Sequence, residues 1–527
     1  MKRYILNTLM WGVLALGASG CTEKYLDINS NPYEPGDLNP DDYALGSAMN
    51  NLAGTVVSAD VNTAQFTDCL LGGPCGGYFA DSGAWAFSIS NFNATNDWTR
   101  VFMMSDQIIP VLYSNLNQVQ IVSQNTDNPV PYAIAMIIKV AAMSRVTDTY
   151  GPIPYTQIGV DGRVTVPYDS QETVYNAFFD ELDEAIATLS ENSSSALVPT
   201  ADYVYSGNVQ QWIKFANSLK LRLAMRISYA NPAKAQEMAE SAVNQEFGVI
   251  ESNEDNAAWH YFGSITNPLF TAINYNGDES RPSAEIVCYM NGYNDNRRAS
   301  YFVNEDGAFD SDVYVGLRRS IDRTDEARAY FPSYSAINIS ANDAIQWMNA
   351  AEVAFLRAEG VAVFGFNLGG TAKDFYEQGI RLSFAQWGAS GEDDYIEDDR
   401  SVPQTYTDPA GLNSYASTIS DITIKWDESA STEEKQERII TQKWIANWML
   451  GSEAWADYRR TGYPRLIPAP AAGNKSGGVV DSNRGARRMP YPSEENANNY
   501  ENVQYARDHY LNGQDNMATD VWWACKQ

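Results

Sequence analysis

Histidine and positive charge are both scarce in this chain of 527 residues. Only two histidines occur, His260 and His509, which is too little for a multi-histidine metal site or for a Ser–His or Cys–His catalytic relay. Lysine and arginine total 36 against 66 aspartates and glutamates, and the formal net charge is −30. A chain this acidic repels nucleic acid and anionic lipid headgroups. The composition therefore predicts neither a metal cofactor nor a nucleic-acid partner.

Cysteine is scarce as well, with five residues in all. Cys69 and Cys75 lie six positions apart around a Gly-Gly-Pro turn, and this spacing allows a disulfide in an oxidising compartment. Two buried thiols are the alternative. Cys288 and Cys525 have no evident partner in the sequence.

An apolar run behind a basic start opens the chain. Lys2 and Arg3 precede the apolar stretch 4–16, which is too short to span a bilayer as a stable helix. Small residues at 18–20 then lead to Cys21. This pattern predicts a bacterial lipoprotein signal peptide over 1–20 with Cys21 as the lipid-bearing residue; an ordinary signal peptide followed by a chance cysteine is the alternative. Because several acyl chains anchor a protein stably, we expect a tethered protein without a transmembrane helix.

Aromatic side chains, in contrast, are plentiful: 32 tyrosines, 19 phenylalanines and 13 tryptophans. A flat aromatic ring covers the apolar C–H face of a sugar, and short polar or charged side chains bind its hydroxyl edge. The composition therefore favours a neutral, hydroxyl-rich ligand.

Helical periodicity dominates the chain. Apolar residues at spacings of three and four predict a long helix from Asp97 through Leu112, and further helices over 131–146, 173–189, 208–229, 233–245, 342–364, 371–387 and 433–450. Paired helices with short turns are the unit of tetratricopeptide-like repeats. We therefore predict a mainly α fold, a superhelix of helix pairs with repeats at about 97–250 and 342–452. Sustained strand–helix alternation is missing, which disfavours a doubly wound α/β fold and a periplasmic solute-binding protein.

Three segments lack the helical period, at about 67–96, 250–340 and 464–527. Long irregular segments in a compact helical body are often functional. We expect the first two to form an extended, loop-rich ligand-binding region, although each aromatic could instead pack as loop core. The candidate ligand-binding residues are Tyr78, Asp81, Trp85, Tyr275, Tyr289, Tyr293, Asp295 and Arg297.

Several longer strings carry a resemblance to a known family. They are TDTYGPIPY at 147–155, WIKFANSLKLRLAMR at 212–226, QKWIA at 442–446, EAWADYRRTGYP at 453–464 and RRMPYP at 487–492. Together with Cys21 and the LDIN string that begins at Leu26, they resemble the SusD/RagB family of nutrient-binding outer-membrane lipoproteins, in order along nearly the whole mature chain. The resemblance implies a tether over 21–40 and a SusD-like body over 41–527, in which four helix pairs carry a loop-built binding face.

The same resemblance implies a location and a partner. We expect a lipid-anchored protein of the outer membrane, exposed at the cell surface, that takes part in nutrient uptake and polysaccharide utilisation. Family members deliver oligosaccharides, or in some cases peptides, to a SusC-like TonB-dependent transporter.

We interpret the family strings themselves as scaffold. The turn residues of the first string would end a buried helix, and the arginines of the second would satisfy polar groups between packed helices. Arg459 and Arg460 would pair with Asp457 or bind loop carbonyls, since a guanidinium offers five donors.

The function predicted from the sequence is non-catalytic glycan binding, without cofactors. A peptide-binding member of the family is one alternative, and a surface glycoside hydrolase is another. A hydrolase needs two carboxylates at a set separation across a cleft. Pairs such as Asp393–Asp394, Asp398–Asp399 and Glu305–Asp306 are expected in any chain this acidic, so they indicate solvated surface instead.

Overall fold

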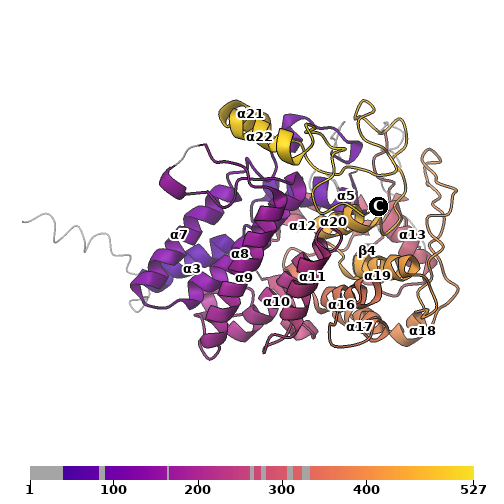
Figure 1. Ribbon diagram of the computed structural model, residues 1–527. Helices are drawn as coiled ribbons and strands as arrows, with labels where there is room; N and C mark the ends of the chain where they lie inside the picture. The colour runs from indigo at the N-terminus through magenta and orange to yellow at the C-terminus, as the bar shows by residue number, and fades with distance from the viewer. Residues whose placement is uncertain are drawn as a thin grey trace, which may run out of the picture. The chain divides into compact units, whose positions relative to one another are not determined.

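The computed structural model describes residues 40–81, 89–162, 165–260, 266–274, 280–304, 313–322 and 333–526 (Figure 1). The chain divides into two units, Met1–Leu45 and Gly46–Gln527. In the first unit only the opening residues of helix α3 (Pro40–Ala53) are described, and all other elements belong to the second. Cys21 lies outside the described residues, so its lipidation stays a prediction.

The second unit is mainly helical. Its helices before residue 260 are α4 (Val61–Ala64), the π-helix η1 (Gln65–Gly72), α5 (Gly73–Cys75), η2 (Ile89–Asn91), α6 (Asn96–Thr99), α7 (Ile109–Asn125), α8 (Val130–Tyr150), η3 (Val160–Gly162), α9 (Gln171–Glu191), η4 (Pro199–Ala201), α10 (Val209–Arg226), α11 (Pro232–Val243) and η5 (Asn253–Asp255). The later helices are α12 (Pro268–Ile273), α13 (Ala284–Gly292), α14 (Arg298–Tyr301), α16 (Ala350–Phe364), α17 (Ala372–Gln386), α18 (Glu392–Ile396), α19 (Thr432–Ala446), α20 (Gly451–Thr461), α21 (Ser493–Asn498) and α22 (Tyr500–Tyr510).

Strands are few and short. Within the described ranges they form three antiparallel pairs: β1 (Phe79–Asp81) with β3 (Ser280–Pro282), β2 (Ala257–Trp259) with β6 (Ile345–Met348), and β4 (Phe302–Val303) with β5 (Ala336–Ile337). Each pair connects segments far apart in the sequence. The strands therefore join loops to one another and build no extended sheet.

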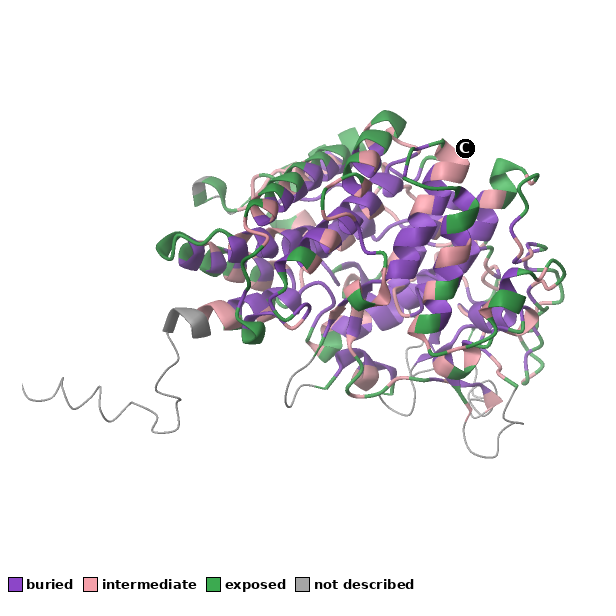
Figure 2. Ribbon diagram, turned by 90° about the horizontal axis from the view of Figure 1, so that it is seen from below, coloured by how far each residue is buried: buried purple, intermediate pink, exposed green. Residues whose placement is uncertain are grey.

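Neighbouring helices pack in sequence order. α7 contacts α8, α8 contacts α9, α9 contacts α10 and α10 contacts α11, while α16 packs against both α17 and α19. A contact between α10 and α16 joins the two sets. Figure 2 shows buried residues concentrated on the helix faces that point inward. The predicted mainly α fold of tetratricopeptide-like helix pairs is confirmed.

The predicted helix 131–146 is confirmed as α8. In the part of the chain that is described, it is the one helix long and apolar enough to cross a membrane, and 83% of that apolar window is buried inside the protein. It ends at Gly151, whose φ of +79° suits a residue without a Cβ. α8 is therefore the central core helix of the repeat body.

Two predicted helices begin later than expected. The helix predicted from Asp97 is broken, because α6 ends at Thr99 and α7 starts only at Ile109, with Pro110 in its first turn. Proline lacks an N–H and is tolerated only in a first turn, so the chain cannot run helically through this position. The helix predicted from Asn342 starts after Asn349, whose side chain caps α16, because residues 345–348 pair as strand β6.

A network of buried ion pairs crosses between the two helix sets. Arg222 of α10 donates from Nε and Nη2 to the two carboxylate oxygens of Glu352 on α16, each at 2.7 Å. One turn along, Arg226 binds Glu453 of α20 and lies 3.3 Å from the Asp148 carboxylate at the end of α8. Burial acts to raise the pKa of the Glu453 carboxyl, but Arg226, Lys443 and Arg222 together lower it well below its ordinary value. Glu453 is therefore a permanent anion of the core.

The network continues through α19 and α20. Lys443 Nζ lies 2.7 Å from Asp457 and 3.1 Å from Glu453. Arg460 donates to both oxygens of Glu359, at 2.8 and 2.7 Å, and to Asp457 at 3.1 Å. All these groups come from the family strings or from α16, which confirms that the arginines of the second string, and Arg460, are scaffold.

Replacing Arg460 by methionine should strongly destabilise the protein. The change removes the guanidinium from Glu359 and Asp457, both buried, and leaves an uncompensated charge in the core. We expect a loss of about 3–5 kcal/mol in the free energy of unfolding, measured by urea denaturation. Arg400→Ala is the matched control, because the Arg400 side chain is 94% exposed and should change stability by less than about 0.5 kcal/mol. Equal effects of the two substitutions would contradict the assigned role.

Candidate ligand-binding site

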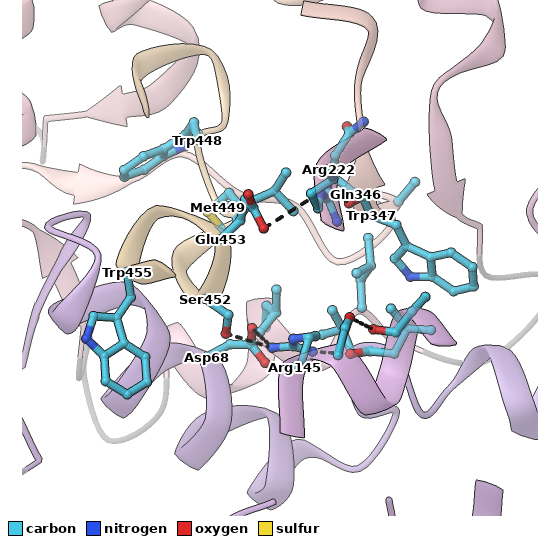
Figure 3. A pocket seen from close by; sticks show the side chains of 18 of the residues that line it. Asp68, Arg145, Arg222, Gln346, Trp347, Trp448, Met449, Ser452, Glu453 and Trp455 are labelled. Atoms are coloured by element: carbon cyan, nitrogen blue, oxygen red, sulfur yellow. Dashed lines mark hydrogen bonds and ion pairs between the residues drawn. The ribbon is translucent and has the colours of Figure 1, made fainter. Parts of the chain in front are cut away.

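A cavity of about 370 Å³ borders the ion-pair network, of which Asp148, Arg222, Arg226 and Glu453 line its wall (Figure 3). Its walls come from segments that are distant in sequence: η1, α8, α10, the start of α12, strand β6, the end of α17 and the turn between α19 and α20. Charged side chains, Asp68, Arg145, Arg222 and Glu453, form the part of the wall that we call the base, and other parts of the wall carry aromatic and amide side chains. It is the candidate binding site of the described protein.

The base of the cavity is charged but internally compensated. Arg145 of α8 donates to Asp68 of η1 at 2.6 Å and to Ser452 of α20 at 3.1 Å. Figure 3 shows this group on one side of the cavity, with Arg222 and Glu453 facing it from the other. Because each of these charges already has a partner of opposite sign, the base offers polar contacts without a strong preference for a charged ligand.

Arg459 also borders the cavity, and it is held differently. Its guanidinium lies 3.7 Å from the centre of the Trp455 ring and donates to the main-chain carbonyls of Asp148 and Arg487. Burial lowers the pKa of Arg459 to about 9, so the side chain is still charged at neutral pH. The expectation that this arginine binds loop carbonyls is confirmed.

Another part of the cavity wall carries an aromatic ring next to amides. Trp387 is partly exposed and packs edge-on against Tyr301, with ring centres 4.7 Å apart. The amide nitrogen of Gln386 donates to Gln346 at 3.2 Å. The side-chain oxygen of Gln386 and the indole N–H of Trp387 have no hydrogen-bond partner in the described ranges. This wall combines an apolar ring with unused hydrogen-bonding capacity.

The turn between α19 and α20 adds backbone strain. Met449 borders the cavity with φ of +78°, a conformation that costs energy for any residue with a Cβ. Its neighbour Trp448 is buried and stacks on Tyr301, with ring centres 5.2 Å apart and planes within 7°. Packing of Trp448 thus holds Met449 at the cavity wall.

Three of the tyrosines predicted to bind ligand are core residues. Tyr78 stacks on Trp444 and donates to the main-chain oxygen of that residue at 2.5 Å. Tyr289 packs edge-on against Trp444, and Tyr293 donates to the carbonyl of Ile422 at 2.8 Å. Each is at most 1% exposed. The prediction that they form a loop-built binding face is therefore wrong for the structure described.

Tyr289 is buried because the segment that contains it forms a helix. Ser283 accepts a hydrogen bond from the main-chain N–H of Ile286 and caps α13, whose apolar residues are buried. Segment 284–292 was expected to be irregular, but it packs as a helix against α19. Residues 67–75, also expected to be irregular, are helical as part of η1 and α5.

The remaining predicted residues fall into two groups. Asp295 and Arg297 are fully buried and pair with each other, and Arg297 also donates to Ser383 at 2.7 Å, so this pair stabilises the interior. Asp81 ends strand β1 opposite Ser280 and is 6% exposed. Trp85 and Tyr275 lie outside the described residues, and their role in binding remains a proposal.

The two cysteines of the Gly-Gly-Pro turn are not bridged. Cys69 lies in η1 and Cys75 at the end of α5, and both are buried thiols. Burial raises the pKa of the Cys75 thiol to about 11. Of the two alternatives drawn from the sequence, the structure shows the second.

Sequence reasoning missed the cavity residues Trp387, Gln386 and Gln346. The tryptophan closes a predicted helix just before Gly388, and the strand that carries Gln346 was expected to be helical. Only the position of Trp387 at a helix end, where its ring need not face the core, was a signal in the sequence.

The fold and this cavity define a class of protein: a helical-repeat binding protein with a partly enclosed polar and aromatic pocket. The SusD-like family, described as Susd and RagB outer membrane lipoprotein, matches residues 27–524. The chain belongs to that family.

Solved structures agree with this assignment. A SusD homolog from Bacteroides uniformis is 68% identical, with a TM-score of 0.90, and the match covers 92% of this chain and 100% of that one. A SusD homolog from Bacteroides thetaiotaomicron is 40% identical, with a TM-score of 0.84 and coverage of 92% and 99%. A chitin-binding SusD homolog from Flavobacterium johnsoniae is 35% identical, with a TM-score of 0.83 and coverage of 92% and 99%. No curated protein matches the chain.

Cys75 should be unreactive in the folded protein. Its thiol is buried and its raised pKa keeps it protonated at pH 8, so iodoacetamide should modify it only after unfolding in urea. Cys525 is exposed and should react without urea, which makes it the internal control. Mass spectrometry of tryptic peptides under non-reducing conditions measures both. Both cysteines fall in one tryptic peptide, because no lysine or arginine lies between them; loss of two hydrogens from that peptide would indicate a disulfide and contradict the assignment of two thiols.

Proposed function

We propose that this protein is a non-catalytic glycan-binding lipoprotein that takes a sugar unit of an oligosaccharide into the cavity beside Trp387. The observation that carries the proposal is the combination of a partly exposed indole, a side-chain amide oxygen without a hydrogen-bond partner in the described chain and a charge-compensated base in one pocket. An indole face accepts the C–H face of a sugar, and the amides accept or donate to its hydroxyls. The chitin-binding homolog supports this ligand class.

The charges favour a neutral glycan. Arg145 with Asp68, and Arg222 with Glu453, compensate each other at the base, and the net charge of −30 repels polyanions at long range.

One stacked ring contributes only a few kcal/mol, at about 25 cal/mol per Å² of apolar area, before ordering costs. We therefore expect modest affinity for each sugar unit.

The carboxylates at the cavity do not suit hydrolysis. A glycosidase needs one carboxyl that can donate a proton near neutral pH and a second that can act as base or nucleophile. Glu453 has a pKa far too low for the acid role. Burial raises the pKa of Asp148, but its carboxylate accepts hydrogen bonds from the Tyr175 hydroxyl at 2.5 Å and the Trp523 indole N–H at 2.8 Å. These bonds on Asp148, and the ion pairs of Glu453 with Arg226 and Lys443, favour a structural role for both groups.

Family membership supports the cellular setting. We propose that the lipid on Cys21 anchors the protein at the outer membrane, with the body exposed at the cell surface. There it would pass captured oligosaccharides to a SusC-like TonB-dependent transporter. The family description as outer membrane lipoprotein supports the anchoring.

Calorimetry with a panel of neutral hexasaccharides tests the proposed function. The panel contains chitohexaose, cellohexaose, maltohexaose, xylohexaose and mannohexaose. We expect at least one to bind with a Kd of about 10 μM to 1 mM, which corresponds to about 4–7 kcal/mol. Reducing ends should not accumulate during incubation. Turnover at enzyme-like rates, or binding of a mixed peptide library with no binding of any sugar, would contradict the proposal.

Trp387→Ala should weaken binding of the hexasaccharide at least about tenfold, because it removes the indole face; this factor corresponds to about 1.4 kcal/mol. Trp387→Phe keeps an aromatic face and should retain most of the affinity. Trp522→Ala is the matched control, since Trp522 is also partly exposed but does not border the cavity. Thermal denaturation checks that all three variants fold. Unchanged affinity in folded Trp387→Ala would remove this ring from the site.

A further inference from the structure

A second hollow of about 420 Å³ lies between α4 with the first turn of η1 on one side and α6 with the segment that follows it on the other. It exists because the chain turns over residues 100–108 where a continuous helix was expected. A hydrogen bond of 3.1 Å between the hydroxyls of Thr63 and Ser105 joins the two sides. We call this hollow the Phe66 groove, because the ring of Phe66 forms part of its surface.

The Phe66 groove and the cavity lie against the same helical segment. Phe66 borders the groove, whereas Asp68, two residues further along, borders the cavity. Side chains two positions apart on a helix are separated by about half a turn and point in roughly opposite directions. The segment η1 is a π-helix, a rare form that occurs frequently at functional sites. One helical wall thus separates the two hollows.

The Phe66 groove contains an aromatic ring surrounded by uncommitted polar side chains. Phe66 is partly exposed and lies 4.9 Å from the Trp98 ring, with the planes inclined by 40°. Asn62, Asp97 and Arg100 are exposed around it, and no hydrogen bond or ion pair engages their side chains in the described chain. A half-covered ring with free amide, carboxylate and guanidinium groups is the arrangement that binds a sugar ring by its face and its hydroxyls.

The charged side chains around the Phe66 groove indicate which class of sugar it could bind. Three carboxylates, of Asp60, Asp97 and Asp106, border the groove against the single cation Arg100, which disfavours an acidic sugar. Asp60 is already engaged, since it accepts from the main-chain N–H of Thr63 at 2.8 Å and caps α4. In the described ranges no group of three metal-ligating side chains is found, so the carboxylates are not arranged as a cation site. A neutral sugar unit fits best.

We infer that the Phe66 groove is a second sugar-binding subsite, and that the groove and the cavity hold separate units of one oligosaccharide across η1. The inference rests on the proposed function, because it takes the ligand to be a glycan chain. Binding of a second unit is then intramolecular, and the affinity for a long chain exceeds that for a short one without any new contact at the first site.

The double variant Asn62→Ala/Arg100→Ala tests this inference. Both side chains are exposed and without partners in the described protein, so the substitutions should leave the fold intact. Calorimetry uses the hexasaccharide of the panel that the unchanged protein binds, together with the disaccharide of the same sugar. We expect the double variant to bind the hexasaccharide at least about tenfold more weakly. The disaccharide should keep its affinity within about twofold, because it occupies the cavity alone. Arg400→Ala, at an exposed position outside both hollows, should change neither.

Three other outcomes overturn the inference, and they are distinguishable. If the double variant binds the hexasaccharide normally while Trp387→Ala does not, the groove is no subsite and the proposed function stands. If the double variant weakens the disaccharide as much as the hexasaccharide, the two hollows do not act as separate subsites. If the unchanged protein binds no member of the panel, the proposed function and the inference fail together.

Discussion

Compensation of buried charge is the constraint on which the rest of this structure depends. An ion taken out of water is costly unless an opposite charge meets it with good geometry. Charged side chains lie in the interior on five helices, α8, α10, α16, α19 and α20. These side chains can pair only when the five helices are packed in one particular arrangement. The ion pairs therefore select the arrangement in which the first helix set contacts the second. Apolar packing alone would tolerate neighbouring arrangements, since it is not directional.

The same requirement shapes the binding site. Because Arg145, Arg222 and Glu453 are held by their partners, the base of the cavity is rigid and close to neutral. Rigid polar groups bind a ligand without first paying to become ordered. The side chains that suit selection among ligands, Trp387 and Gln386, border the same cavity from the end of α17. The ion-paired helices thus form a stable frame, and the wall residues Trp387 and Gln386 take no part in the ion pairs.

Local signals in the sequence predicted the frame well and the site poorly. The helices at 131–146 and 173–189 are predicted by the spacing of their apolar residues, a pattern that involves only residues close together in the chain. The burial of Tyr289 does not, because the ring meets Trp444, which lies 155 positions further along the chain. Tyrosine, asparagine and glycine mixed in one segment look alike whether they form an exposed loop or a capped, buried helix. The cap at Ser283 was the one local sign that α13 would form.

The helical class, the order of the helices, the family and the scaffold role of the longest shared strings could all be predicted from the amino-acid sequence. These depend on periodicity and on residues close together in the chain. Which aromatic rings face a ligand could not be predicted in this way, because it depends on the tertiary structure. The cavity brings together η1, β6 and the end of α17, and whether a ring is exposed there depends on which distant helix covers it. The spacing of residues in the sequence cannot predict whether a ring is buried in this way, because its burial results from contacts between segments that only folding brings together.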